Sequence, residues 1–137
     1  MRGKDFFIFA NTLHNSEIEA ARRSSVSRAY YALYHHVREC LLSSGIPVSI
    51  KPEEHERMTR YLKNSGIEKV KQVGEKMNDI RVKRNKADYE LSDKSFNKMT
   101  CGLYCAMTEN LLNELDSIDK GQLKRGLVDY AGSINEL

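Results

Sequence analysis

The sequence predicts an all-α protein, an up-and-down bundle of four to five helices. Helix-breaking residues are scarce, because the 137 residues include only two prolines and eight glycines. Apolar residues recur every three or four positions over long stretches, which is the spacing of a helix face that packs on a core. No stretch shows the alternation of apolar and polar residues that is typical of a half-buried strand.

The first half of the chain contains two predicted helices. Residues 4–13 form a short one. Ser16 followed by Glu19 is a capping-box pattern, so a long helix is expected from there to about Ser44, where Gly45 stops it. Its apolar positions keep helical spacing: Val26, Ala29, Tyr30, Leu33, Val37, Cys40 and Leu41.

Three further long segments have helical patterns. Pro52 suits the first turn of a third helix, which ends near residues 64–66. A fourth helix runs from about Ile67 to Tyr89, and Ser92 is the expected cap of the last long helix. We assign the inner face of that last helix to Phe96, Met99, Leu103, Met107, Asn110, Leu111 and Leu115.

The chain is predicted to contain one main domain. Residues 1–118 are expected to form the bundle, and residues 119–137 a C-terminal tail or a short helix. In that tail, Leu123, Leu127, Tyr130 and Ile134 have helical spacing.

Composition predicts a cytoplasmic protein without cofactor or metal. No signal peptide is visible, and the apolar run at residues 6–10 is too short to span a bilayer. Cys40, Cys101 and Cys105 are an odd number of cysteines, which favours reduced, buried thiols over a zinc site. No glycine-rich phosphate loop and no metal-binding motif is present. No membrane, metal or cofactor role is therefore expected.

One arginine lies where helical spacing requires an apolar residue. Arg84 falls on the stripe formed by Val70, Val73, Met77, Ile80, Arg84 and Ala87. A buried and unpaired guanidinium costs several kcal/mol or more, so Arg84 needs a carboxylate, a wet cleft or an anionic ligand. Asp88 lies one helical turn further on and is a candidate partner.

Basic residues gather around this arginine. Residues 69–86 contain seven Lys or Arg side chains, among them Lys83 and Lys86, and only two acidic ones. Two interpretations remain open: a solvated helix face, or a surface that attracts phosphate.

A second face of the first long helix carries Arg28, Tyr31 and His35 at helical spacing. It is either a solvated face with an aromatic ring resting on a neighbouring helix, or a cleft whose cation, phenol and imidazole hold phosphate and move protons. His55 lies at the acidic start of the third helix, and only the tertiary structure can bring it near Arg84.

Two motifs resemble those of HEPN domains, the helical domains named for higher eukaryotes and prokaryotes nucleotide-binding. The segment Ser27–His35 is similar to the signature in the first long helix of that family. The segment Arg84–Tyr89, which reads RNKADY, is similar to its second motif, in the variant that reads RNxADY. His55 and a final long helix follow the family's order, and the resemblance covers residues 16–118.

The resemblance implies a bundle that commonly forms homodimers, with the arginine motifs facing each other across a shared cleft. Many HEPN domains are metal-independent endoribonucleases, and others bind nucleotides or serve as non-catalytic partners. They often occur beside a small nucleotidyltransferase in toxin–antitoxin or defence operons.

The chain departs from the ribonuclease members of this family at one place. Those members carry a histidine four to six residues after the arginine, where this chain has Asp88, Tyr89 and then Glu90. If the protein is an enzyme, Arg84, Asp88, Tyr89 and His35 are the catalytic candidates. The candidates for binding RNA or a nucleotide are Arg28, Tyr31, Asn85, Lys83 and Lys86.

Three hypotheses follow from these observations. The first is a HEPN-type toxin or defence protein that acts on or binds RNA through a dimer cleft around Arg84. The second is a non-catalytic HEPN module that binds a nucleotide or a partner protein, such as an antitoxin or a nucleotidyltransferase. The third is a plain helical dimer in which Arg84 and Asp88 form a structural pair.

Overall fold

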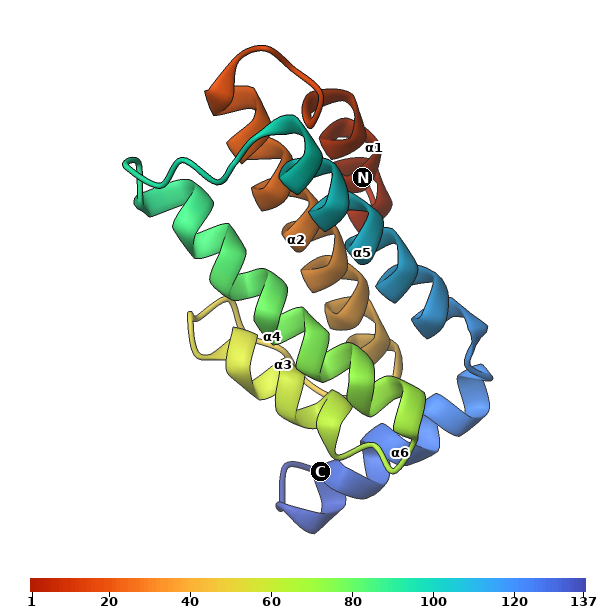
Figure 1. Cartoon of the computed structure of the whole chain (residues 1–137). Helices are drawn as coiled ribbons and strands as arrows, with labels where there is room; N and C mark the ends of the chain where they lie inside the picture. Colours follow the sequence, from red (N-terminus) through yellow and green to blue (C-terminus); the bar gives the residue numbers. More distant parts are fainter.

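A computed structural model describes residues 1–137 and confirms the all-α class. The chain forms six helices and no strand, one helix more than the four to five predicted. They are α1 (Gly3–Leu13), α2 (Glu19–Ser43), α3 (Glu54–Lys63), α4 (Glu68–Tyr89), α5 (Lys98–Ser117) and α6 (Lys120–Ser133). The three long helices, α2, α4 and α5, run along the length of the molecule, and α6 crosses one end (Figure 1).

Helix α2 is the centre of the bundle, because it packs against all five other helices. Tyr30, Leu33 and Val37 of α2 are completely buried, and they belong to one core with Met58 of α3 and Met77 of α4. The inner stripe predicted for α4 is confirmed, since all six of its residues are buried, Arg84 among them. Helical periodicity therefore located this face of α4 correctly.

The predicted helix starts need three corrections. Helix α2 begins at Glu19 without a side-chain cap, and the Ser16 hydroxyl instead accepts a hydrogen bond from the Ile18 N–H in the preceding turn (3.1 Å). Pro52 lies in the turn before α3. Helix α5 is capped by Asn97, whose side-chain oxygen accepts from the Thr100 N–H (2.8 Å), and Ser92 is in the preceding loop. In each case the chain makes a local turn before the helix begins.

The inner face predicted for α5 is largely wrong. Met99, Leu103 and Met107 are exposed, with 78%, 58% and 37% of their surfaces accessible. The side of α5 that faces the core carries Cys101, Cys105, Thr108, Leu111, Leu112 and Leu115. Small residues on this side let α5 approach closely: the Cys105 sulfur lies 4.0 Å from the Ser25 carbonyl oxygen of α2. Phe96, Leu111 and Leu115 are buried as predicted.

Residues 119–137 form the sixth helix and its C-terminal extension. Leu123 and Leu127 join the core, as does Ala131. After the helix, the Glu136 carboxylate accepts hydrogen bonds from the Arg57 guanidinium (2.8 Å) and the Tyr61 hydroxyl (2.6 Å) of α3. The segment is thus docked on the bundle by apolar and polar contacts together.

The three cysteines are unpaired; Cys101 and Cys105 are buried, and Cys40 is half-buried. None of the six helices combines the length and the apolar character that a membrane span requires.

Candidate functional site

Arg84 lies on the side of α4 that faces α2, where three neighbours hold its guanidinium. Its Nε donates to the Asp88 carboxylate (3.1 Å), and its two terminal nitrogens donate to the Asn85 side-chain oxygen (2.9 Å) and the Tyr31 hydroxyl (3.0 Å). The guanidinium also lies over the rings of Tyr31 and Tyr30, at 5.1 and 5.8 Å from their centroids. The carboxylate partner predicted from helical spacing is therefore confirmed.

Asp88 is fixed by two hydrogen bonds that reach the same oxygen. Its Oδ2 accepts from Arg84 and from the buried Ser27 hydroxyl of α2 (3.2 Å). The second oxygen, Oδ1, has no protein partner, and the side chain keeps 28% of its surface exposed. One carboxylate oxygen thus serves the fold and the other is free.

His55 joins this cluster from the first turn of α3. The Tyr30 hydroxyl lies 2.5 Å from His55 Nδ1, and the imidazole packs on the rings of Tyr30 and Tyr34. Burial, together with the charges of Arg81 and Arg84, lowers the pKa of His55 to about 4. Burial also raises the pKa of Tyr30, so this phenol keeps its proton and can donate it to Nδ1. In the tautomer whose Nδ1 accepts from Tyr30, the neutral ring carries its proton on Nε2.

Arg81 is a member of the site that sequence analysis did not single out. It lies one turn before Arg84 on α4, and its charge acts on His55. No carboxylate pairs with Arg81, and its buried Nε has no hydrogen-bond partner. The only sequence signal was its place in the basic stretch of residues 69–86, which also includes residues that lie elsewhere.

Phe6 of α1 packs against two of the three side chains for which a shared cleft was one interpretation. The Arg28 guanidinium lies 5.3 Å from the Phe6 ring centroid, and His35 stacks on the same ring at 5.5 Å. The Tyr31 ring lies 6.4 Å from that of His35, and its hydroxyl accepts from Arg84. His35 also lines a hollow of about 640 Å³ together with Arg2, Lys4, Phe6, His36 and Glu39. Burial lowers the pKa of His35.

The remaining predicted residues lie at the edge of the cluster. Tyr89 is the last residue of α4 and is 75% exposed, without a hydrogen-bond partner. Lys83 lines a hollow of about 350 Å³ between α4 and α5. Lys86 is half-buried, and its carbonyl accepts a hydrogen bond from Arg23 (3.4 Å). These three residues therefore lie outside the hydrogen-bonded contacts of Arg84.

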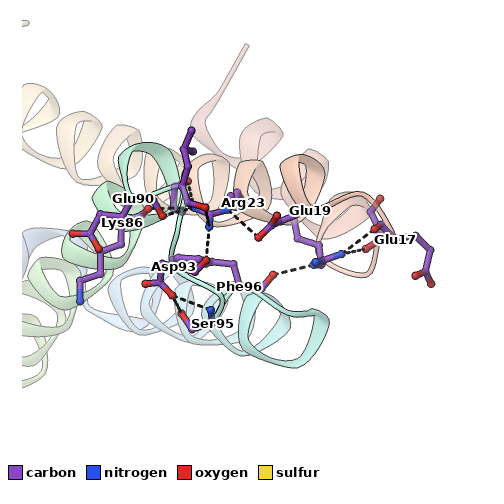
Figure 2. A network of polar contacts seen from close by, with 12 residues as sticks. Glu17, Glu19, Arg23, Lys86, Glu90, Asp93, Ser95 and Phe96 are labelled. Carbon is purple, nitrogen blue, oxygen red and sulfur yellow. Dashed lines mark hydrogen bonds and ion pairs between the residues drawn. The ribbon is translucent and has the colours of Figure 1, made fainter.

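Arg23 of α2 fixes the end of α4 that carries these residues. Its guanidinium is buried and donates to five carbonyl oxygens. Three of these, on Lys86 (3.4 Å), Ala87 (3.0 Å) and Glu90 (3.1 Å), belong to the end of the helix, and two, on Leu91 (3.3 Å) and Asp93 (2.5 Å), belong to the following loop. Figure 2 shows Arg23 between Glu19 on one side and Lys86, Glu90 and Asp93 on the other. One buried cation thus supplies donors to carbonyls at the helix end and in the loop, including that of Ala87, which has no backbone donor.

The cluster combines two arginines, a neutral imidazole and tyrosine rings. No group of three His, Cys, Asp or Glu side chains is arranged to hold a metal ion. Comparisons of the chain with protein-family models, with curated proteins and with solved structures find no match. What the site can bind or catalyse must therefore be inferred from its own geometry.

Proposed function

We propose that the chain is a HEPN-type domain that binds RNA, holding a backbone phosphate at Arg81 and Arg84 in a toxin–antitoxin or defence system. The observation that carries this proposal is Arg81, a half-buried cation without a carboxylate partner beside His55 and Arg84. An arginine in that position serves neither an ion pair nor a helix end. Its terminal nitrogens have no protein acceptor either and are not buried, so a phosphate can accept from them.

Arg84 contributes to the same binding. Its three protein hydrogen bonds use fewer N–H groups than a guanidinium has, so donors remain for a ligand. His55 is neutral at physiological pH and adds an Nε2–H donor in the tautomer whose Nδ1 accepts from Tyr30. Arg81 and the free donors of Arg84 and His55 form a surface that suits phosphate oxygens, which are acceptors only.

Aromatic rings beside these donors favour RNA over a small inorganic anion. Tyr31 and His55 are half-buried, so each keeps part of its ring accessible. Unstacked bases of single-stranded RNA stack on exposed aromatic side chains, and arginines then hold the backbone. A single nucleotide would make fewer of these stacking and phosphate contacts than an RNA strand.

The arrangement favours binding over cleavage. Cleavage without metal needs a base for the 2′-hydroxyl proton and an acid for the leaving oxygen. The Nδ1 atom of His55 already accepts from Tyr30, and a histidine with a pKa near 4 carries no extra proton at neutral pH. The Asp88 Oδ2 already accepts hydrogen bonds from Arg84 and Ser27, so this oxygen is not available to take a proton from RNA. We therefore expect RNA to be bound and left intact.

A second copy of the chain is the partner that we propose for the exposed side of α5. Met99, Leu103 and Met107, together with Ala106, form a stripe without charge. Val82 of α4 extends it across the hollow between the helices. Apolar stripes of this kind mark protein interfaces. An antitoxin or a nucleotidyltransferase is the second candidate for the same surface, because methionine-rich faces adapt to different partners.

RNA binding is tested by fluorescence anisotropy with a labelled single-stranded RNA in EDTA. Arg81→Gln is expected to weaken binding by about 10-fold. The slope of log Kd against log salt concentration should fall by about 1, the value of one lost phosphate contact. Arg60→Gln is the matched control, because Arg60 is an exposed arginine of α3. Equal affinities of the two variants would remove Arg81 from the site. RNA fragments that accumulate with wild-type protein but not with Arg84→Ala would support a ribonuclease instead.

The dimer is tested by light scattering after size exclusion. Leu103→Glu places a charge in the middle of the stripe, so we expect a dimer to become a monomer. Gln122→Glu adds the same charge at an exposed position of α6 and serves as the control. A monomeric wild-type protein would exclude the second copy as the occupant.

A further inference from the structure

We propose that Asp88 makes the site selective for RNA over DNA, because its free Oδ1 accepts a hydrogen bond from a ribose 2′-hydroxyl. This inference rests on the RNA-binding function proposed above. It assigns Asp88 a role in specificity in addition to its ion pair with Arg84.

The first step is the orientation of the carboxylate. Arg84 and Ser27 both donate to Oδ2, at 3.1 and 3.2 Å, and they do so from two different helices. Ser27 is buried, with 6% of its surface exposed. These two bonds fix the plane of the carboxylate, and Oδ1, which has no protein partner, is the oxygen that remains for solvent or a ligand. The acceptor is therefore oriented before a ligand arrives.

The second step is the chemical contrast between Asp88 and its neighbours. Arg81, Arg84 and the His55 Nε2–H offer donors, and the Asn85 oxygen already accepts from Arg84. Asp88 Oδ1 is thus the free acceptor beside a surface of donors. A phosphodiester has no donor to give it, so a phosphate alone meets electrostatic repulsion at Asp88.

The third step identifies a ligand that satisfies both kinds of group. In RNA, each phosphate has a 2′-hydroxyl on the adjacent ribose, which can donate to a carboxylate while the phosphate accepts from the arginines. DNA offers the same phosphate without this donor. A site whose polar group is left unpaired by an analogue rejects that analogue, so DNA should bind about 10- to 100-fold more weakly than RNA.

The test compares three single strands of the same sequence: RNA, DNA and RNA with 2′-O-methyl groups. The methylated strand keeps the sugar shape of RNA but loses the donor. For wild-type protein we expect RNA to bind more tightly than both others. In Asp88→Ala the RNA-to-DNA ratio should fall to about 1, because DNA binding improves when the repulsive charge is gone. Asp88→Asn keeps a neutral acceptor and should give an intermediate ratio. Glu90→Gln, an exposed acid just after α4, should leave the ratio unchanged.

The outcomes separate the two proposals. If wild-type protein binds RNA and DNA equally, or if the preference persists in Asp88→Ala, Asp88 does not read the 2′-hydroxyl and the RNA-binding function stands. If no strand binds, the RNA-binding function itself is wrong. Because each ratio compares ligands on one protein, partial unfolding of a variant lowers both affinities and leaves the ratio intact.

Discussion

The Tyr30 hydroxyl lies 2.5 Å from Nδ1 of His55, although 25 positions separate the two residues in the chain. Tyr30 is completely buried in α2, and His55 belongs to the first turn of α3. This contact attaches the start of α3 to the centre of the bundle and brings an imidazole next to Arg81 and Arg84. Because burial and both arginines oppose its protonation, His55 is neutral in the folded protein over the physiological pH range.

Stability should fall as the pH drops from about 6.5 to about 4. The pKa of His55 is about 4 in the folded chain, below the value near 6.5 of an unfolded one, so the unfolded state binds more protons within this window. His35 contributes in the same direction. We expect a loss on the order of 1 kcal/mol from His55, because solvent screens its half-exposed ring. Urea unfolding at several pH values measures it.

His55→Gln is the control for this pH dependence. Glutamine retains an acceptor for the Tyr30 hydroxyl but does not titrate, so stability should fall less steeply between pH 6.5 and 4. An equal slope in wild type and variant would show that other groups cause the dependence.

Arg84 and Asp88 should show a measurable coupling energy. Arg84→Ala leaves the Asp88 charge with only the Ser27 hydroxyl and should cost about 2 kcal/mol of stability. Asp88→Ala leaves the buried guanidinium without a counter-charge. The double variant should be more stable than the sum of the two losses predicts, by about 1 kcal/mol. Chemical denaturation of the four proteins gives this value, and strict additivity would contradict the ion pair.

Arg23 should be among the most sensitive positions of the chain. Arg23→Ala leaves the carbonyl oxygens of Ala87, Leu91 and Asp93 without a donor, and we expect a loss of about 3 kcal/mol or more. Arg23→Lys keeps the charge but not the fork of donors, so it should rescue little. Arg38→Ala, on the same helix at a half-buried position, is the comparison. Similar thermal stabilities of the Arg23 and Arg38 variants would refute this role.

Two glycines of α6 should respond in opposite ways to alanine. A Cβ on Gly126 would lie 2.2 Å from the Ser65 carbonyl oxygen, which is backbone and cannot move aside. Gly126→Ala should therefore displace α6 and cost about 2–3 kcal/mol. At Gly132 a Cβ meets nothing within 4 Å, so Gly132→Ala should stabilise by about 0.5–1 kcal/mol. If both variants matched the wild type in thermal unfolding, α6 would not pack as closely on Ser65 as described.

The buried face of α4 could be predicted from the sequence, whereas the buried face of α5 could not. In α4, charged residues occupy every other face, so only the stripe from Val70 to Ala87 can enter a core. In α5, two faces are free of charge: one with Met99, Leu103 and Met107, the other with Cys101, Cys105 and Thr108. Large apolar residues indicated the first face. The bundle buries the second, since small side chains permit the close approach to α2.

The candidate site was predictable where its contacts are local. The Arg84–Asp88 pair joins residues one turn apart, so helical geometry alone brings them together. Contacts between helices gave no such signal. Nothing in the sequence placed Phe6 between Arg28 and His35, directed His55 to Tyr30 or distinguished Arg81 from the other basic residues of α4.

The sequence by itself determined that the chain is helical, that Arg84 enters the interior and that Asp88 accompanies it. These facts depend on the period of the α-helix, which the backbone imposes within a few residues. Only the tertiary structure decided which groups meet Arg84 from other helices, which face of α5 is buried and which oxygen of Asp88 remains free. These features depend on how six amphipathic helices pack around one core. The packing energy is set by contacts between helices that are distant in the sequence, so no local pattern predicts it.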